Sequence, residues 1–150
     1  MKNLGILIIA LAIMSACGGS GNEGQNKASD EKLNATVIAN PMSSKGVGPV
    51  SHVELGEIDP AKVEAGKKIF EEKCTACHRP DQKFIGPAPA GITQRRSPEW
   101  IMNMILNPEE MVQKDPIAKQ LLIEANGAPM ANQNLTEEEA RKVLEYFRTL

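Results

Sequence analysis

Four dipeptides that pair a helix-capping residue with proline constrain this chain more than any other feature. They are Asp59-Pro60, Ser97-Pro98, Asn107-Pro108 and Asp115-Pro116. Asp, Ser and Asn accept hydrogen bonds from the free N–H groups of a helix's first turn, and proline is well tolerated at the first helical position. Each dipeptide therefore predicts the start of a helix. The predicted helices span residues 60–73, 98–106, 108–113 and 116–125.

A fifth helix is predicted at the C-terminal end of the sequence. Thr136 and Glu139 have the spacing of a capping box. The apolar residues that follow recur at the intervals of one helix face, and they are Ala140, Val143, Leu144 and Phe147. No stretch alternates apolar and polar residues as a half-buried strand does. The chain is therefore predicted to be all-α, with one domain over residues 59–150.

The chemistry of the sequence is concentrated in Cys74-Thr75-Ala76-Cys77-His78, at the end of the first of these helices. This C-x-x-C-H pattern is the attachment signature of c-type haem. Thiols three positions apart can reach the two vinyl groups at one porphyrin edge, and the next residue supplies an imidazole for the iron. The pattern predicts one haem c, attached covalently through Cys74 and Cys77, with His78 as an axial ligand.

Other functions of a cysteine pair fit the sequence less well. A structural zinc site needs four ligands, and His52 is the remaining histidine outside the motif. A thioredoxin-like dithiol is expected in a βαβ context, which an all-α chain lacks. An exported disulfide leaves His78 without a role. We expect His52, which lies in a Pro- and Gly-rich segment, to face solvent or to pack against the domain rather than to bind haem.

The N-terminal residues predict export and a lipid anchor. Lys2 precedes an apolar run over residues 4–14, which is shorter than the roughly 20 residues of a membrane-spanning helix. Residues 1–16 are therefore predicted to be a signal peptide. Met14-Ser15-Ala16-Cys17 resembles the lipobox of bacterial lipoproteins, in which the cysteine carries the lipid. The alternative is an ordinary cleaved signal followed by an unrelated cysteine.

Two segments are predicted between the signal peptide and the domain. Residues 17–34 are rich in Gly, Ser, Asn, Gln and charged residues, which favours a flexible tether. Residues 35–58 combine several valines and isoleucines with prolines and glycines, which favours an extended arm laid along the domain. A formal net charge of −2 gives no electrostatic basis for a nucleic-acid partner.

From residue 59 onward the sequence resembles the small class I monohaem cytochromes c. Gly66 and Phe70 precede the haem motif as in that family, Gly86-Pro87 follows it, and Tyr146 matches an aromatic residue of the last helix. The resemblance implies three to five helices around one haem, with the first and last helices crossing closely at Gly66. It also implies an electron carrier rather than an enzyme, because a six-coordinate iron leaves no open site for a substrate.

The resemblance further implies roles for residues around the haem. The Pro87 carbonyl would accept a hydrogen bond from the second ring nitrogen of His78. Met130, in the loop before the last helix, would be the sixth iron ligand. The other methionines downstream of the motif are expected in the core, and they are Met102, Met104 and Met111.

Three residues downstream of the motif resemble a stretch that often contacts haem propionates. They are Arg95, Arg96 and Trp100. The guanidinium groups and the indole N–H would donate hydrogen bonds to the propionates. The alternative is a pair of surface arginines beside a core tryptophan.

The sequence as a whole predicts a carrier that shuttles single electrons at the cell envelope, periplasmic or on the outer face, anchored to the membrane through lipidated Cys17. A quinol-oxidising complex is compatible as the donor, and a terminal oxidase or nitrogen-oxide reductase as the acceptor. The alternatives are a five-coordinate haem sensor that binds small gases and, with less support, a structural zinc module. All five aromatic residues lie after residue 69, so we expect the haem to complete a core that the chain alone fills poorly.

Overall fold

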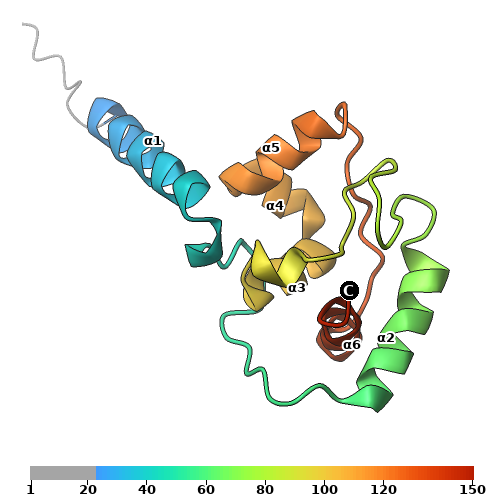
Figure 1. Cartoon of the computed structure of the whole chain (residues 1–150). Helices are drawn as coiled ribbons and strands as arrows, with labels where there is room; N and C mark the ends of the chain where they lie inside the picture. The colour runs from blue at the N-terminus through green and yellow to red at the C-terminus, as the bar shows by residue number, and fades with distance from the viewer. Residues whose placement is uncertain (1–22) are drawn as a thin grey trace, which may run out of the picture.

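The computed structural model describes residues 23–150, and the predicted signal peptide and Cys17 lie outside them. The described residues form six α-helices and no strands (Figure 1). The helices are α1 (Glu23–Ala39), α2 (Pro60–Lys73), α3 (Pro98–Leu106), α4 (Pro108–Lys114), α5 (Pro116–Glu124) and α6 (Glu137–Phe147). Two short 3-10 helices, η1 (Pro41–Ser43) and η2 (Ile92–Gln94), lie between them. The all-α prediction is confirmed.

Proline occupies the first position of α2, α3, α4 and α5, as predicted. The side chains of Asp59, Ser97 and Asp115 each accept a hydrogen bond from a first-turn N–H of the following helix. Asn107 makes no such bond to α4. Its side-chain amide donates instead to the Val47 carbonyl (3.3 Å) and to the Glu110 carboxylate (2.7 Å). Asn107 occupies the N-cap position of α4, but the predicted side-chain cap is wrong, because its amide donates to these two acceptors and accepts no hydrogen bond from an N–H of the first turn.

Helices α2 and α6 form the most extensive helix pair and lie side by side (Figure 1). They approach so closely that a Cβ on Gly66 would overlap the Lys142 carbonyl oxygen and lie 2.9 Å from the Val143 nitrogen. Next to this crossing, the Phe70 ring packs against Tyr146 and Phe147, with ring centroids 5.6 and 5.7 Å apart. The predicted close crossing at Gly66 is confirmed.

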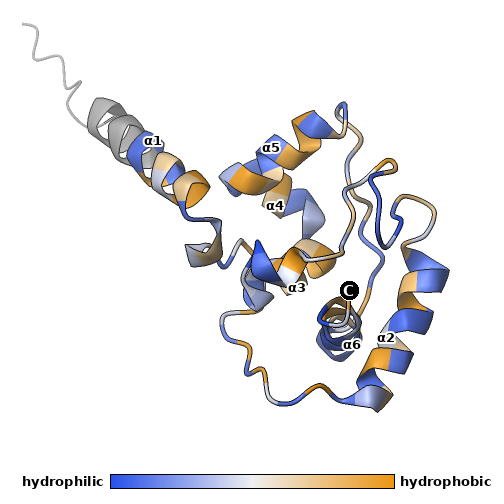
Figure 2. Cartoon of the chain, viewed as in Figure 1, coloured by the Kyte–Doolittle hydropathy of each residue, from blue (hydrophilic) through white to orange (hydrophobic). Residues whose placement is uncertain are grey.

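Helix α1 occupies residues for which the composition predicted a flexible tether and the beginning of an extended arm. Its alanine, lysine, glutamate and glutamine residues favour helix. Figure 2 shows hydrophobic residues at the end of α1 nearest the domain, where Val37 packs against the core and the helix contacts α5. Local propensity and this contact explain the difference. No helix within residues 23–150 is long and apolar enough to span a membrane.

Residues 44–58 contain no helix or strand and run along α3 as an extended arm. Val50 is buried, and the buried Asn103 side chain binds both polar groups of its backbone. The Asn103 Oδ1 accepts from the Val50 N–H, and its Nδ2 donates to the Val50 carbonyl, each at 2.9 Å. At the end of the arm, the Asp59 N–H donates to the buried Glu145 (3.0 Å). These bonds fix the arm to α3 and α6.

Candidate haem site

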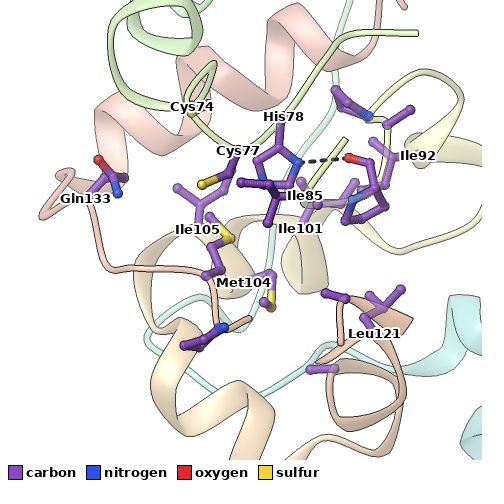
Figure 3. Close-up of a pocket in the computed structure, with 18 of the residues that line it drawn as sticks. Cys74, Cys77, His78, Ile85, Ile92, Ile101, Met104, Ile105, Leu121 and Gln133 are labelled. Atoms are coloured by element: carbon purple, nitrogen blue, oxygen red, sulfur yellow. Dashed lines mark hydrogen bonds between the residues drawn. The ribbon is translucent and has the colours of Figure 1, made fainter. Parts of the chain in front are cut away.

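The C-x-x-C-H residues form a tight turn at the C-terminal end of α2. The Cys74 N–H completes the helix by donating to the Phe70 carbonyl (2.9 Å). The N–H groups of Cys77 and His78 both donate to the Cys74 carbonyl, at 3.1 and 2.9 Å. This turn brings the two thiols and the imidazole to the wall of one cavity (Figure 3).

The two cysteines of the motif are free thiols in different environments. Cys74 is half-buried, and Cys77 is exposed. Burial raises the pKa of the Cys74 thiol to about 11, and the neighbouring Cys77 adds to the shift. Cys74 is therefore protonated at neutral pH. No disulfide joins the two in this structure, so both thiols are available for attachment to a haem.

The His78 ring is fixed by the Gly86-Pro87 pair that follows the motif. Its Nδ1 lies 2.8 Å from the Pro87 carbonyl oxygen (dashed line in Figure 3). A carbonyl can only accept, so Nδ1 carries the proton and Nε2 of the neutral imidazole keeps a free lone pair. A Cβ on Gly86 would lie 2.8 Å from Nδ1 and 2.9 Å from Nε2, so a side chain there would displace the ring. The Pro87 carbonyl therefore has the position relative to His78 that the family resemblance implies.

The cavity below this turn encloses about 1070 Å³, counting its open mouth. None of the residues that line it is charged. Isoleucine and leucine side chains from α3, α5 and the loop after the motif make much of the wall, and those labelled in Figure 3 are Ile85, Ile92, Ile101, Ile105 and Leu121. Such a wall suits a large, flat, apolar ligand far better than it suits a polar substrate.

Two methionines line the cavity, Met104 from α3 and Met130 from the segment between α5 and α6. Met102 and Met111 are buried in the core, as predicted, with 2% and 0% of their surface exposed. The same prediction holds only in part for Met104, which is half-buried, packs against the core and also lines the cavity. Ile101 on the same helix is likewise both a core residue and part of the cavity wall, so this part of α3 contributes to both. Figure 3 shows it across the cavity from His78.

Arg95, Arg96 and Trp100 line a groove that adjoins the cavity. The Arg96 guanidinium lies 5.4 Å from the centroid of the Trp100 ring, and its Nε is buried without a hydrogen-bond partner among the described residues. Arg95 donates to the Ala88 carbonyl (3.2 Å). The Trp100 indole N–H donates to the buried Asp115 (3.1 Å). The expectation that this N–H binds a propionate does not hold, because Asp115 takes the donor, and the Trp100 ring contributes only its apolar surface to the cavity.

One further residue of the cavity wall was not predicted from the sequence. Gln133 places an amide there (Figure 3), and the only signal for it is its position three residues after Met130. His52 is exposed, with its Nδ1 3.9 Å from the Glu99 carboxylate, and does not line the cavity. No group of three or more His, Cys, Asp or Glu residues in the part of the chain described here could hold a metal ion, so the zinc alternative gains no support.

The residues present fit a haem c. Two thiols lie at one edge of an uncharged cavity, and an imidazole is oriented with its Nε2 free. In the adjoining groove, Arg96 has a buried N–H without a partner, which a carboxylate such as a haem propionate would satisfy.

The sequence profile of the family described as cytochrome c matches residues 63–150. The chain belongs to the cytochrome c family. The matched residues include most of α2 and everything after it. This cytochrome c therefore carries a covalent haem c, with Cys74 and Cys77 as the attachment residues, and its family is one of haem-binding electron carriers.

Solved structures support the same assignment. A cytochrome c from Rhodothermus marinus is 45% identical, with a TM-score of 0.66 over 80% of this chain and 95% of that one. An engineered form of that protein, Rma TDE, matches with a TM-score of 0.65, and its complex with a carbene intermediate (1-ethoxy-1-oxopropan-2-ylidene) with 0.63. Both are 45% identical and are covered over 96% of their length. A comparison with curated proteins found no match.

Proposed function

We propose that this cytochrome c is a one-electron carrier of the cell envelope in which His78 and Met130 ligate the haem iron. The observation that supports this most strongly is the 2.8 Å hydrogen bond from His78 Nδ1 to the Pro87 carbonyl. It leaves Nε2 free as a ligand, and Met130 lines the same cavity. Bound haem supplies reversible one-electron exchange between ferric and ferrous iron.

The surrounding residues would set the reduction potential of the iron, and none of them would form or break a covalent bond during electron transfer. A thioether ligand and burial both favour the reduced state and so raise the reduction potential. The walls carry no charge and are largely apolar, so they offer water few hydrogen-bond partners. If His78 and Met130 both ligate the bound haem, no iron position would be left for a substrate or a gas, as expected of a carrier and not of a five-coordinate sensor.

The edge of the site at Cys77 is the natural point of electron entry and exit. Cys77 is exposed, and the apolar side chains beside it, Phe84 and Ile85, are 50% and 45% exposed. The Arg79 guanidinium lies 4.2 Å from the centroid of the Phe84 ring. A redox partner could therefore approach the cofactor here through a small apolar surface with a positive charge next to it.

The proposed partners are a quinol-oxidising complex as donor and a terminal oxidase or nitrogen-oxide reductase as acceptor. We test this by mixing the oxidised protein with membranes from the organism that carries it, with and without a quinol substrate. The expected result is quinol-dependent reduction of one electron per haem, followed by reoxidation when oxygen or nitric oxide is added. A haem that stays oxidised beside membranes that reduce a control cytochrome c would contradict the proposal.

Attachment to the membrane is proposed through lipidated Cys17, on the strength of the Met14-Ser15-Ala16-Cys17 sequence. Several acyl chains on one cysteine would hold the protein stably at the membrane surface. We expect Cys17→Ser to move the protein from the membrane fraction to the soluble fraction, while Ser15→Ala leaves it on the membrane. Retention of the Cys17→Ser variant would refute the anchor and leave the electron-carrier proposal intact.

A further inference from the structure

The cavity holds two thioethers, although one methionine is enough to ligate the iron. Of the methionines among the described residues, only Met104 and Met130 line it. Figure 3 shows Met104 on the side of the cavity across from His78, the side from which a sixth ligand must come. Met104 is only half-buried, unlike the core residues Met102 and Met111. From this half-buried position it packs against the core and also reaches the cavity wall.

A hydrogen bond from a side chain to a backbone carbonyl links the two segments that carry these methionines. The Asn132 side-chain amide donates to the Leu106 carbonyl at 3.3 Å. Asn132 follows Met130 by two residues, and Leu106 follows Met104 by two residues. The loop with Met130 and the end of α3 with Met104 are thus neighbours at the same part of the cavity.

The two methionines differ in how firmly their backbones are held. Met104 lies inside α3, whose N-terminus is capped by Ser97 and whose residues Ile101 and Ile105 are buried. Met130 lies in the segment between α5 and α6, where residues 126–129, 131, 132 and 134 are exposed. Segments with few buried contacts open at a much lower free-energy cost than packed helices. Met130 is therefore the ligand that leaves first, and Met104 stays in place.

We propose that Met104 is a reserve ligand of this cytochrome c, which takes the sixth position on the haem iron whenever the loop withdraws Met130. The inference rests on the proposed His78 and Met130 ligation. In the exchange, the iron–sulfur bond to Met130 breaks and one to the Met104 sulfur forms, with no transfer of a proton or an electron. Because both donors are neutral thioethers, opening of the loop leaves the iron six-coordinate and closed to small molecules.

The test uses the full-length, haem-loaded protein in four forms: wild type, Met130→Ala, Met104→Leu and the double variant. The readout is the near-infrared sulfur-to-iron charge-transfer band of the oxidised protein. We expect the band in wild type and in both single variants, and its loss in the double variant. Met130→Ala combined with Met102→Leu is the matched control, because Met102 is on the same helix but does not line the cavity. This control should keep the band.

A second readout is the rate of carbon monoxide binding to the reduced protein. If Met104 fills the sixth position for about 90% of the time in Met130→Ala, the double variant should bind at least about tenfold faster than the single variant. Should Met130→Ala fail to accumulate as loaded protein, Met130→Leu keeps the volume of the side chain and serves in its place.

The outcomes separate this inference from the proposed function. Loss of the band in Met130→Ala to the same extent as in the double variant would overturn the reserve role and leave Met130 as the resident ligand. Loss of the band in Met104→Leu alone would overturn both, because Met104 would then be the resident ligand.

Discussion

The close crossing of α2 and α6 is possible because residue 66 is glycine, which has only a hydrogen atom where any other amino acid would carry a Cβ. In Gly66→Ala the new carbon would overlap the carbonyl group of Lys142 and lie 2.9 Å from the Val143 nitrogen. These neighbours are backbone atoms, so no change of rotamer relieves the overlap. An ordinary contact begins at 3.4 Å. The two helices must therefore move apart by more than about 1 Å, a shift that a close-packed interior resists.

The cost of this shift can be worked out from its parts. Overpacking of a core costs about 1–3 kcal/mol, and a backbone overlap belongs at the upper end of that range. The pairs of Phe70 with Tyr146 and Phe147 beside the crossing would also loosen, at about 0.5–1.5 kcal/mol each. Alanine returns about 1 kcal/mol through its better helix propensity. The net loss is about 3–5 kcal/mol, which for a domain of this size lowers Tm by at least about 12 °C.

The assay is thermal unfolding of the haem-loaded protein, followed by circular dichroism. Gly56→Ala is the matched control, because a Cβ there would meet nothing within 4 Å. It should stay within about 1 kcal/mol of wild type. If Gly66→Ala and Gly56→Ala melt at the same temperature, the helix crossing does not have the close packing described above.

Three further predictions concern the site and its support. Gly86→Ala should displace the His78 ring, because its Cβ would lie 2.8 Å from Nδ1; the optical spectrum should then show a high-spin fraction that wild type lacks. Glu145 is buried, which disfavours its charged form, but bonds from its arginine partners and a backbone N–H outweigh this and hold its pKa below 4.5. The stabilising effect of the charged carboxylate is therefore complete above pH 4.5 and declines as the pH falls below it. Glu145→Gln should be less stable than wild type at neutral pH, by at least about 1 kcal/mol, and should lose less stability than wild type in acid. Urea unfolding at pH 7 and pH 3.5 would show both effects. The double variant Cys74→Ser/Cys77→Ser, expressed without attached haem, should unfold without a cooperative transition and should bind a hydrophobic dye. A sharp melting transition of this variant would contradict the view that the cofactor completes the core.

The helix starts could be predicted from the sequence because their determinants are local. Proline after Asp or Ser specifies a capped first turn within four residues of chain, and Asp59, Ser97 and Asp115 cap as expected. Asn107 has the same local pattern but bonds to Val47, which is 60 residues away in the sequence. A contact over that separation leaves no trace in the local pattern.

The haem motif and the histidine support could be predicted for a similar reason, since His78, Gly86 and Pro87 lie within ten residues of each other. The roles of Met104 and Trp100 could not. Periodicity shows that Met104 is on an apolar face of its helix, but whether that face meets the core alone or also lines the cavity depends on how the helices pack. In the same way, the Trp100 indole N–H pairs with Asp115 rather than with the cofactor, a choice made by tertiary structure.

The measurement that tests the carrier function most directly is the mixing of reduced, haem-loaded wild-type protein with carbon monoxide in a stopped-flow spectrometer. Ligation by His78 and Met130 predicts almost no spectral change on the timescale of seconds, because both axial positions are filled by side chains. Rapid and complete formation of a carbon monoxide adduct would contradict it and identify a five-coordinate haem protein that binds gases.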